Sequence, residues 1–120
     1  MSREGVVKRS KELACVPVAA GTETKTAVLI GPDDGARNFA MRRFTMGEGG
    51  GMPRHTNLVE HEQYVIRGRA RVTVGDTVHQ VGEGDVLLIH GGTPHSYEVV
   101  QAPFEFICVV PNREDQIELC

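Results

Sequence analysis

The chain has 120 residues, of which 13 are Lys or Arg and 16 are Asp or Glu, giving a formal net charge of −3. This length suits one domain with a single core, and mild acidity without a basic block argues against nucleic-acid binding. No stretch approaches the roughly 18 apolar residues of a membrane span, and residues 1–14 lack the apolar core of a signal peptide. The three cysteines form no CxxC pair, so we expect a reduced, cytoplasmic protein without a zinc knuckle.

Residues 1–24 are expected to form an N-terminal arm. The apolar run at 13–20 is interrupted by Pro17, which suits an edge strand better than a central one. Such an arm can fold over its own sheet or pair with a neighbouring subunit, and exposed edges are commonly covered by a partner. We therefore expect a homodimer.

From residue 26 onwards, short apolar runs alternate with glycine-rich turns. Strands are predicted at 26–31, 38–46, 61–68, 69–74, 77–81, 86–89, 93–100 and 104–111. The glycines at 47–51 read as a flexible approach to the segment that follows, and the polar tail from 112 as a short helix or a disordered end. No interior segment has a helical period, so roughly ten short strands in one small domain indicate an all-β sandwich or barrel.

Three histidines and an asparagine form a candidate metal site. His55 and Asn57 are two residues apart and leave an extended strand on the same face. His61 opens the next predicted strand, and His95 follows a Thr-Pro corner far along the chain. Neutral imidazole is the commonest metal-binding side chain, so we predict that these residues converge on a metal ion. The competing interpretation is a barrel that has lost its metal.

Other side chains are placed by alternation. Gln63 shares the face of His61 and is the expected polar group inside the pocket. Tyr97, two residues from His95, either presents its hydroxyl to a ligand or packs in the core. Phe106 and Cys108 lie on one face of the last long strand and read first as core.

At this point the residues resemble the cupin family. Its first motif is a glycine, five residues, His-x-His, three or four residues, an acid, six residues and a glycine. Its second motif has a glycine, a Pro-Gly corner, a His and a later Asn. The first spacing is reproduced by Gly49, His55-Thr56-Asn57, His61 and Gly68, and the second by Gly84-Asp85, Gly92 and His95. The resemblance covers residues 38–111.

The chain departs from the family pattern at four positions: Asn57 replaces the second histidine of the first motif, His61 the usual glutamate, His90 the proline and Val99 the asparagine. The resemblance implies a metal held by His55, His61 and His95, with Asn57 either a fourth ligand or a hydrogen-bonding group beside bound water. It also implies that Phe106 and Cys108 lie along the pocket wall, and that the protein pairs as a dimer.

As a whole, the resemblance implies a single-domain, all-β jelly-roll barrel (a double-stranded β-helix) over residues 25–111, with the arm at 1–24 and a polar tail at 112–120. The implied cofactor is one divalent transition metal, and Mn, Fe, Ni, Zn and Cu remain open. The implied function is a mononuclear non-haem oxygenase or dioxygenase acting on a small molecule. The alternatives are a metal-bearing module that binds or senses a small ligand, and a metal-dependent isomerase. Because no inward-facing carboxylate is visible in the sequence, an isomerase that abstracts a proton is disfavoured.

Overall fold

The computed structural model describes residues 4–120 and is built from antiparallel strands, as predicted. The only helical segments among these residues are two 3-10 turns, Ser10–Glu12 and Pro32–Asp34, and no helix is long and apolar enough to cross a membrane. The strands are β1 (Val16–Pro17), β2 (Thr22–Ile30), β3 (Phe39–Asn57), β4 (His61–Val74), β5 (Thr77–Gly82), β6 (Val86–Ile89), β7 (His95–Pro111) and β8 (Ile117–Leu119).

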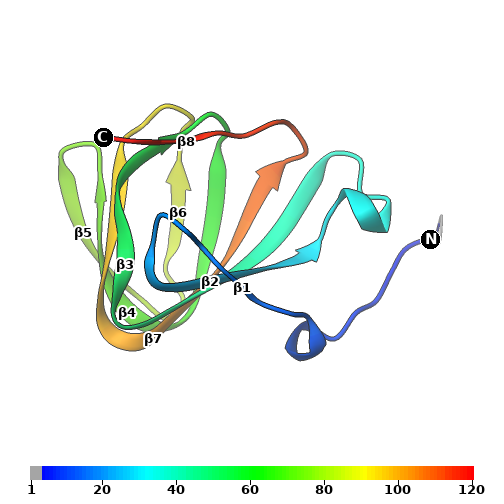
Figure 1. Cartoon of the computed structure of the whole chain (residues 1–120), viewed down its shortest axis with the longest axis horizontal. Coiled ribbons are helices and arrows are strands. Elements are labelled where there is room, and N and C mark those ends of the chain that lie inside the picture. The colour runs from blue at the N-terminus through cyan, green and yellow to red at the C-terminus, as the bar shows by residue number, and fades with distance from the viewer. Residues whose placement is uncertain (1–3) are drawn as a thin grey trace.

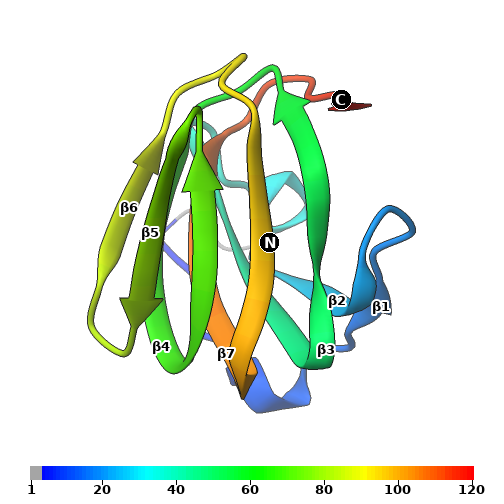
Figure 2. The same cartoon turned by 90° about the vertical axis from the view of Figure 1, so that its left-hand side faces the viewer.

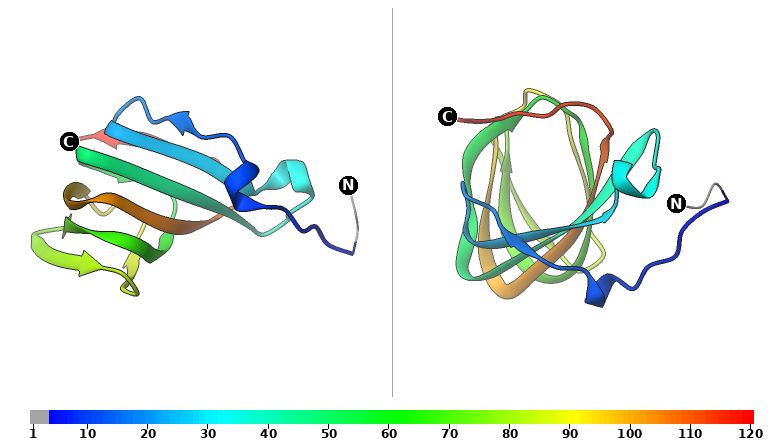
Figure 3. Two further views of the ribbon diagram at one scale, coloured as in Figure 1. Left: turned by 90° about the horizontal axis from the view of Figure 1, so that it is seen from below. Right: turned by 45° about the vertical axis from the view of Figure 1, so that its right-hand side comes forward.

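The strands follow the order β1-β2-β3-β7-β4-β5, with β6 added to β4 and β8 added to β3. Figures 1 and 2 show the long strands β3, β4 and β7 crossing the molecule, with β5 and β6 at one end. In the right-hand view of Figure 3 the strands curve around a central axis, while the N-terminal segment lies outside. The jelly-roll barrel expected from the sequence is therefore confirmed.

Three predicted strand breaks are instead bends within longer strands. β3 continues through the glycines at 47–51, β4 through Gly68, and β7 joins the two segments predicted at 93–100 and 104–111. Register shifts mark these places, between Met46 and Gly51 in β3 and between Val65 and Ala70 in β4. The extra residues of such bulges bend a strand without ending it, which explains why the structure has fewer and longer strands than predicted.

The bulge in β4 also changes which residues face inward. His61, Gln63 and Val65 are buried on one side of Gly68, and Ala70 and Val72 on the other. The first set has odd numbers and the second even numbers, so a strict alternation along β4 would expose one of them. The shift keeps both halves of the strand in the core, which continues across β7 through Phe104, Phe106 and Cys108.

The two ends of the chain add strands to the outside of the barrel. Only Val16–Pro17 of the N-terminal apolar run forms a strand, paired with Lys25–Thr26 of β2, and β2 itself begins at Thr22. The C-terminal tail is neither a helix nor irregular throughout, because β8 pairs with His55–Asn57 of β3. The tail therefore runs alongside the strand that carries two of the candidate ligands. The homodimer stays a prediction.

Replacing Gly68 by Ala should destabilise the fold strongly. Gly68 has a φ of +80°, and an added Cβ would lie 2.1 Å from the Pro103 carbonyl oxygen and 2.7 Å from that of Gln101. Gly75, with a φ of +60° and no atom near its Cβ position, is the matched control. We expect Gly75→Ala to cost about 1–2 kcal/mol from the left-handed backbone alone, and Gly68→Ala at least about 3 kcal/mol because a clash is added. Urea unfolding measures both, and equal costs would contradict the close approach.

Candidate functional site

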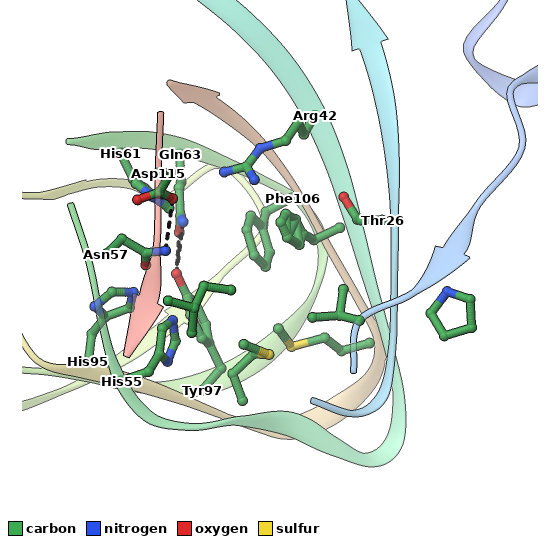
Figure 4. Close-up of a pocket in the computed structure, with 16 residues that line it drawn as sticks. Thr26, Arg42, His55, Asn57, His61, Gln63, His95, Tyr97, Phe106 and Asp115 are labelled. Atoms are coloured by element: carbon green, nitrogen blue, oxygen red, sulfur yellow. Dashed lines mark hydrogen bonds and ion pairs between the residues drawn. The ribbon is translucent and has the colours of Figure 1, made fainter. Parts of the chain in front are cut away.

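A cavity of about 230 Å³ lies inside the barrel. One wall is apolar, and the other carries the predicted imidazoles (Figure 4). The apolar lining consists of Pro17, Val18, Phe44, Met46, Met52, Phe106 and Ile117. Among residues 4–120, the buried side-chain polar atoms without a hydrogen-bond partner belong to Thr26, Arg42, Asn57 and His61, and all four residues line this cavity. Such atoms are few in folded proteins, so their concentration here makes this cavity the candidate functional site.

His55 and His95 face each other across the β3–β7 pair. They are register partners, and their ring centroids are 4.2 Å apart. The Nδ1 of His55 bonds to the Pro53 carbonyl at 2.7 Å, and that of His95 to the Thr93 carbonyl at 2.8 Å. Because a carbonyl only accepts, each Nδ1 carries the proton and each Nε2 keeps a free lone pair. Both rings are 3 % exposed or less.

His61, the third predicted imidazole, begins β4, and its ring centroid lies 6.1 Å from that of His95. Its Nδ1 lies 3.4 Å from the Cys108 sulfur, while its buried Nε2 has no hydrogen-bond partner. Burial, followed by the charges of Arg42 and His95, lowers the pKa of His61 to about 4, against an opposing effect of Asp115. His61 is therefore neutral near pH 7, the state in which an imidazole binds a metal.

Asn57 is held by a carboxylate that the sequence analysis missed. Its Nδ2 donates to Asp115 Oδ2 at 3.0 Å, and its Oδ1 is buried without a partner. The expectation that no carboxylate faces the pocket is wrong, because Asp115 lines it. The tail gives no periodic signal for this placement. The only hint is the alternation of Ile117 and Leu119, which is typical of the strand that brings the preceding turn to the cavity.

The other oxygen of Asp115 is held by the backbone. Asp115 Oδ1 accepts hydrogen bonds from the N–H groups of Leu58 at 2.8 Å, Val59 at 3.3 Å and Gln116 at 2.8 Å. Partial burial raises the pKa of Asp115, whereas these bonds and the one from Asn57 lower it. The lowering effects together outweigh burial, so the pKa of Asp115 lies below its usual range. Asp115 is therefore a fixed anion at the cavity.

Gln63, predicted to lie inside the pocket, and Tyr97, predicted either to present its hydroxyl to a ligand or to pack, both line the cavity as a hydrogen-bonded pair. Gln63 Nε2 lies 2.8 Å and Oε1 3.0 Å from the Tyr97 hydroxyl. Burial raises the pKa of Tyr97, so the phenol stays protonated. Its ring stacks on Phe106 with centroids 5.4 Å apart. Cys108 is fully buried beside His61 and Gln63 rather than on the cavity surface, and burial raises the pKa of its thiol.

Arg42 is a second cavity residue that sequence reasoning missed. It extends from β3 toward the cavity (Figure 4), with its guanidinium carbon 5.0 Å from the centre of the Phe44 ring and Nη2 3.6 Å from the Cys108 sulfur. Its Nε is buried without a partner, and no Asp or Glu among residues 4–120 forms an ion pair with it. Arg42 could not be predicted as a cavity residue, because alternation along the strand leaves open whether Arg42 or Arg43 faces inward.

The donor atoms suit a metal in type and protonation, although they are not gathered as they stand. No three His, Cys, Asp or Glu side chains within residues 4–120 are grouped closely enough to hold an ion. However, all three imidazoles line this region. His61 has a buried Nε2 without a hydrogen-bond partner, His55 and His95 bond to backbone carbonyls through Nδ1, and Asn57 adds an unpartnered oxygen. Neutral nitrogen donors of this kind favour transition metals. Binding an ion there would require the side chains to rotate toward one another.

Comparison with known proteins agrees with the fold. The cupin domain model matches residues 42–110. No curated protein sequence matches the chain. Among solved structures, the polyketide cyclase RemF from Streptomyces resistomycificus is similar over 95% of this chain and 85% of its own, with 26% identity and a TM-score of 0.85.

Two further structures show the same fold at lower identity. A cupin 2 conserved barrel domain protein from Rhodopseudomonas palustris has 24% identity and a TM-score of 0.81, covering 90% of this chain and 77% of its own. A predicted oxalate decarboxylase from Thermotoga maritima has 20% identity and a TM-score of 0.78, covering 90% of this chain and 100% of its own.

Because Gln63 and Tyr97 satisfy each other, Tyr97→Phe should destabilise the protein. Losing the hydroxyl leaves a buried amide short of partners, at a cost of about 1–3 kcal/mol. The double variant Tyr97→Phe/Gln63→Leu removes both polar groups and should recover part of that loss. Urea unfolding of the two single variants and the double variant gives the coupling. Strictly additive losses would show that the pair does not interact.

Proposed function

The chain belongs to the cupin family, and from this membership and its cavity we propose that it is a metal-dependent enzyme that oxidises a small anionic molecule with dioxygen. The observation that carries the proposal is the set of three imidazoles that line one end of the cavity. His55 and His95 bond to backbone carbonyls through Nδ1, which leaves Nε2 to accept a ligand, and His61 has a buried Nε2 without a hydrogen-bond partner. Three imidazoles that line one cavity with Nε2 atoms left unbonded have few uses other than binding a metal.

His55, His61 and His95 would hold the ion, with Asn57 beside it. A bound Mn, Fe, Ni, Zn or Cu ion supplies Lewis acidity, and the redox-active ones among these also supply reactivity toward dioxygen. The protein contributes the neutral state of His61 and the backbone bonds that fix the tautomers of His55 and His95. It also contributes a largely apolar wall that excludes water.

The cavity limits the substrate. About 230 Å³ is below the range of roughly 300–1,000 Å³ for drug-sized ligands, so the substrate is compact. Arg42 offers a guanidinium without an ion pair, and such a group pairs best with a carboxylate or another oxyanion. The stacked rings of Phe44 and Phe106 add an apolar surface to the cavity wall. A small carboxylate, enolate or phenolate fits all three features.

Proton abstraction from carbon is less well supported because the cavity lacks a strong base. Asp115 has a lowered pKa, and burial keeps Tyr97 and Cys108 protonated near pH 7. A dioxygenase needs no such base. Both oxygen atoms of O₂ enter the substrate, which itself provides the four electrons, so no external reductant is required.

A second candidate is a metal-dependent enzyme that moves protons without using oxygen. The similarity to the polyketide cyclase RemF and the carboxylate of Asp115 beside His61 favour it over a module that only binds a ligand. The two enzymes differ in their need for dioxygen, which provides the test.

Metal content should depend on the three imidazoles. Replacing His55, His61 or His95 by Ala should remove most of the bound metal, since the remaining pair holds an ion weakly. Asn57→Ala should weaken binding by about 10–100-fold, as loss of an orienting partner does, and Asn57→His should strengthen it. Elemental analysis and chelator competition measure this, with His79→Ala on the exposed face of β5 as the control. Equal metal content in all variants would overturn the proposal.

Metal-loaded protein should consume dioxygen with a small anionic diketone, phenol or thiol, in step with substrate loss. An oxygen electrode with mass spectrometry of products from ¹⁸O₂ measures both atoms of the label. Arg42→Met should raise KM by about 10–100-fold, because a hydrogen bond to a charged group contributes about 1.5–3 kcal/mol. Equal product formation without oxygen would favour the proton-transfer enzyme, and binding without product would favour the module.

A further inference from the structure

We propose that Asp115, carried by the C-terminal tail, is the fourth protein ligand of the metal, and that Asn57 orients it. The inference rests on the proposed function, because it assigns a residue to the same ion. It concerns a carboxylate that lies outside both sequence motifs and reaches the site from the last nine residues of the chain.

The distances place Asp115 within reach of the ion that His61 would bind. Asp115 Oδ2 lies 4.0 Å from His61 Nε2. Two atoms that each bind one ion at 2.0–2.2 Å are at most about 4.3 Å apart, and these two atoms fall within that limit. Figure 4 shows Asp115 beside His61 and Asn57, at the end of the cavity where His55 and His95 also lie.

The two oxygens of Asp115 have different surroundings. Oδ1 takes three backbone N–H groups, from Leu58, Val59 and Gln116. Oδ2 takes one hydrogen bond, from Asn57 Nδ2 at 3.0 Å, and keeps a lone pair. The side chain is 26 % exposed. One oxygen therefore anchors the carboxylate and the other is left to bind a ligand.

The hydrogen bond to Asp115 also explains why an asparagine stands at position 57. An amide beside a carboxylate must present its N–H₂ group, so the orientation of Asn57 is fixed by chemistry. Where an imidazole would itself occupy a coordination position, Asn57 instead supports a carboxylate, as the residues behind metal ligands commonly do. Loss of one ligand from the strand is thus offset by a ligand from the tail.

Pairing with β3 holds the C-terminal tail where Asp115 can reach the metal site. β8 pairs with β3 through His55–Leu119, Thr56–Glu118 and Asn57–Ile117, and the N–H of Cys120 donates to the Arg54 carbonyl at 3.0 Å. The same residues of β3 carry two of the other site groups. The position of Asp115 relative to His55 and Asn57 is therefore set by a backbone ladder rather than by a free end.

The test compares Asp115→Asn with Glu114→Gln, which makes the same change of charge at the neighbouring, exposed position. Purified full-length protein is stripped of metal and titrated with Zn²⁺ against a chelator and with Co²⁺ by absorption spectroscopy. We expect Glu114→Gln to bind like the parent. Asp115→Asn should bind at least about 100-fold more weakly, beyond the 10–100-fold typical of an outer partner, and should change the Co²⁺ d–d bands. Asp115→Ser, whose hydroxyl still accepts backbone N–H groups, should do the same.

Each outcome decides between the alternatives. Weaker binding with unchanged Co²⁺ bands in both Asp115 variants would make Asp115 a positioning residue and overturn its ligation. Unchanged affinity would overturn it outright while leaving the three-histidine site intact. If the parent protein binds neither ion, the proposed function fails, and this inference fails with it. Urea unfolding of the metal-free variants separates loss of the tail from loss of a ligand.

Discussion

The position of β7 between β3 and β4 is the constraint on which the site depends. The first half of β7 sets His95 opposite His55 and Tyr97 opposite Met52. Its second half sets Cys108 opposite both Arg42 and Gln63. A slip of one residue in either pairing would turn these side chains to the outer face. The glycine bulges near Gly51 and Gly68 fix the register, since the backbone approaches there too closely for any side chain.

Much of this arrangement could be predicted because it is local. Alternation over two residues puts His55 with Asn57 and His61 with Gln63, and the strands leave each pair buried. The lengths of the strands could not be read in the same way, because glycines mark both turns and bulges, and only the pairing partner distinguishes them. Asp115 was out of reach for a different reason. Its contacts with Asn57 and Leu58 span almost half the chain, and the alternation of Ile117 and Leu119 indicates a strand without showing which strand it pairs with.

The cavity lowers the stability of the barrel. His61 Nε2, Asn57 Oδ1 and Arg42 Nε are buried without partners, and each such atom costs on the order of 1–3 kcal/mol. The barrel tolerates this cost because its buried apolar residues, among them Met46, Val72, Ile89 and Phe104, form one core cluster. A bound ion would satisfy His61 Nε2, and an anionic substrate would satisfy Arg42 Nε. Binding and stability are therefore linked here, since a ligand that fills the cavity also removes the cost of keeping it open.

The C-terminal tail contributes both to ligand binding and to the stability of the fold. Asp115 caps the backbone of the turn between β3 and β4 with one oxygen and faces the imidazoles with the other. The turn it caps lies between Asn57 and His61, so the same carboxylate fixes the spacing of two site residues. β8 is only three residues long, and its side chains are exposed, so apolar burial does little to hold the tail. Its hold comes from the ladder with β3 and from Asp115 itself. An ion bound to Asp115 would therefore tighten the tail, and the tail in turn closes the wall of the cavity at Ile117.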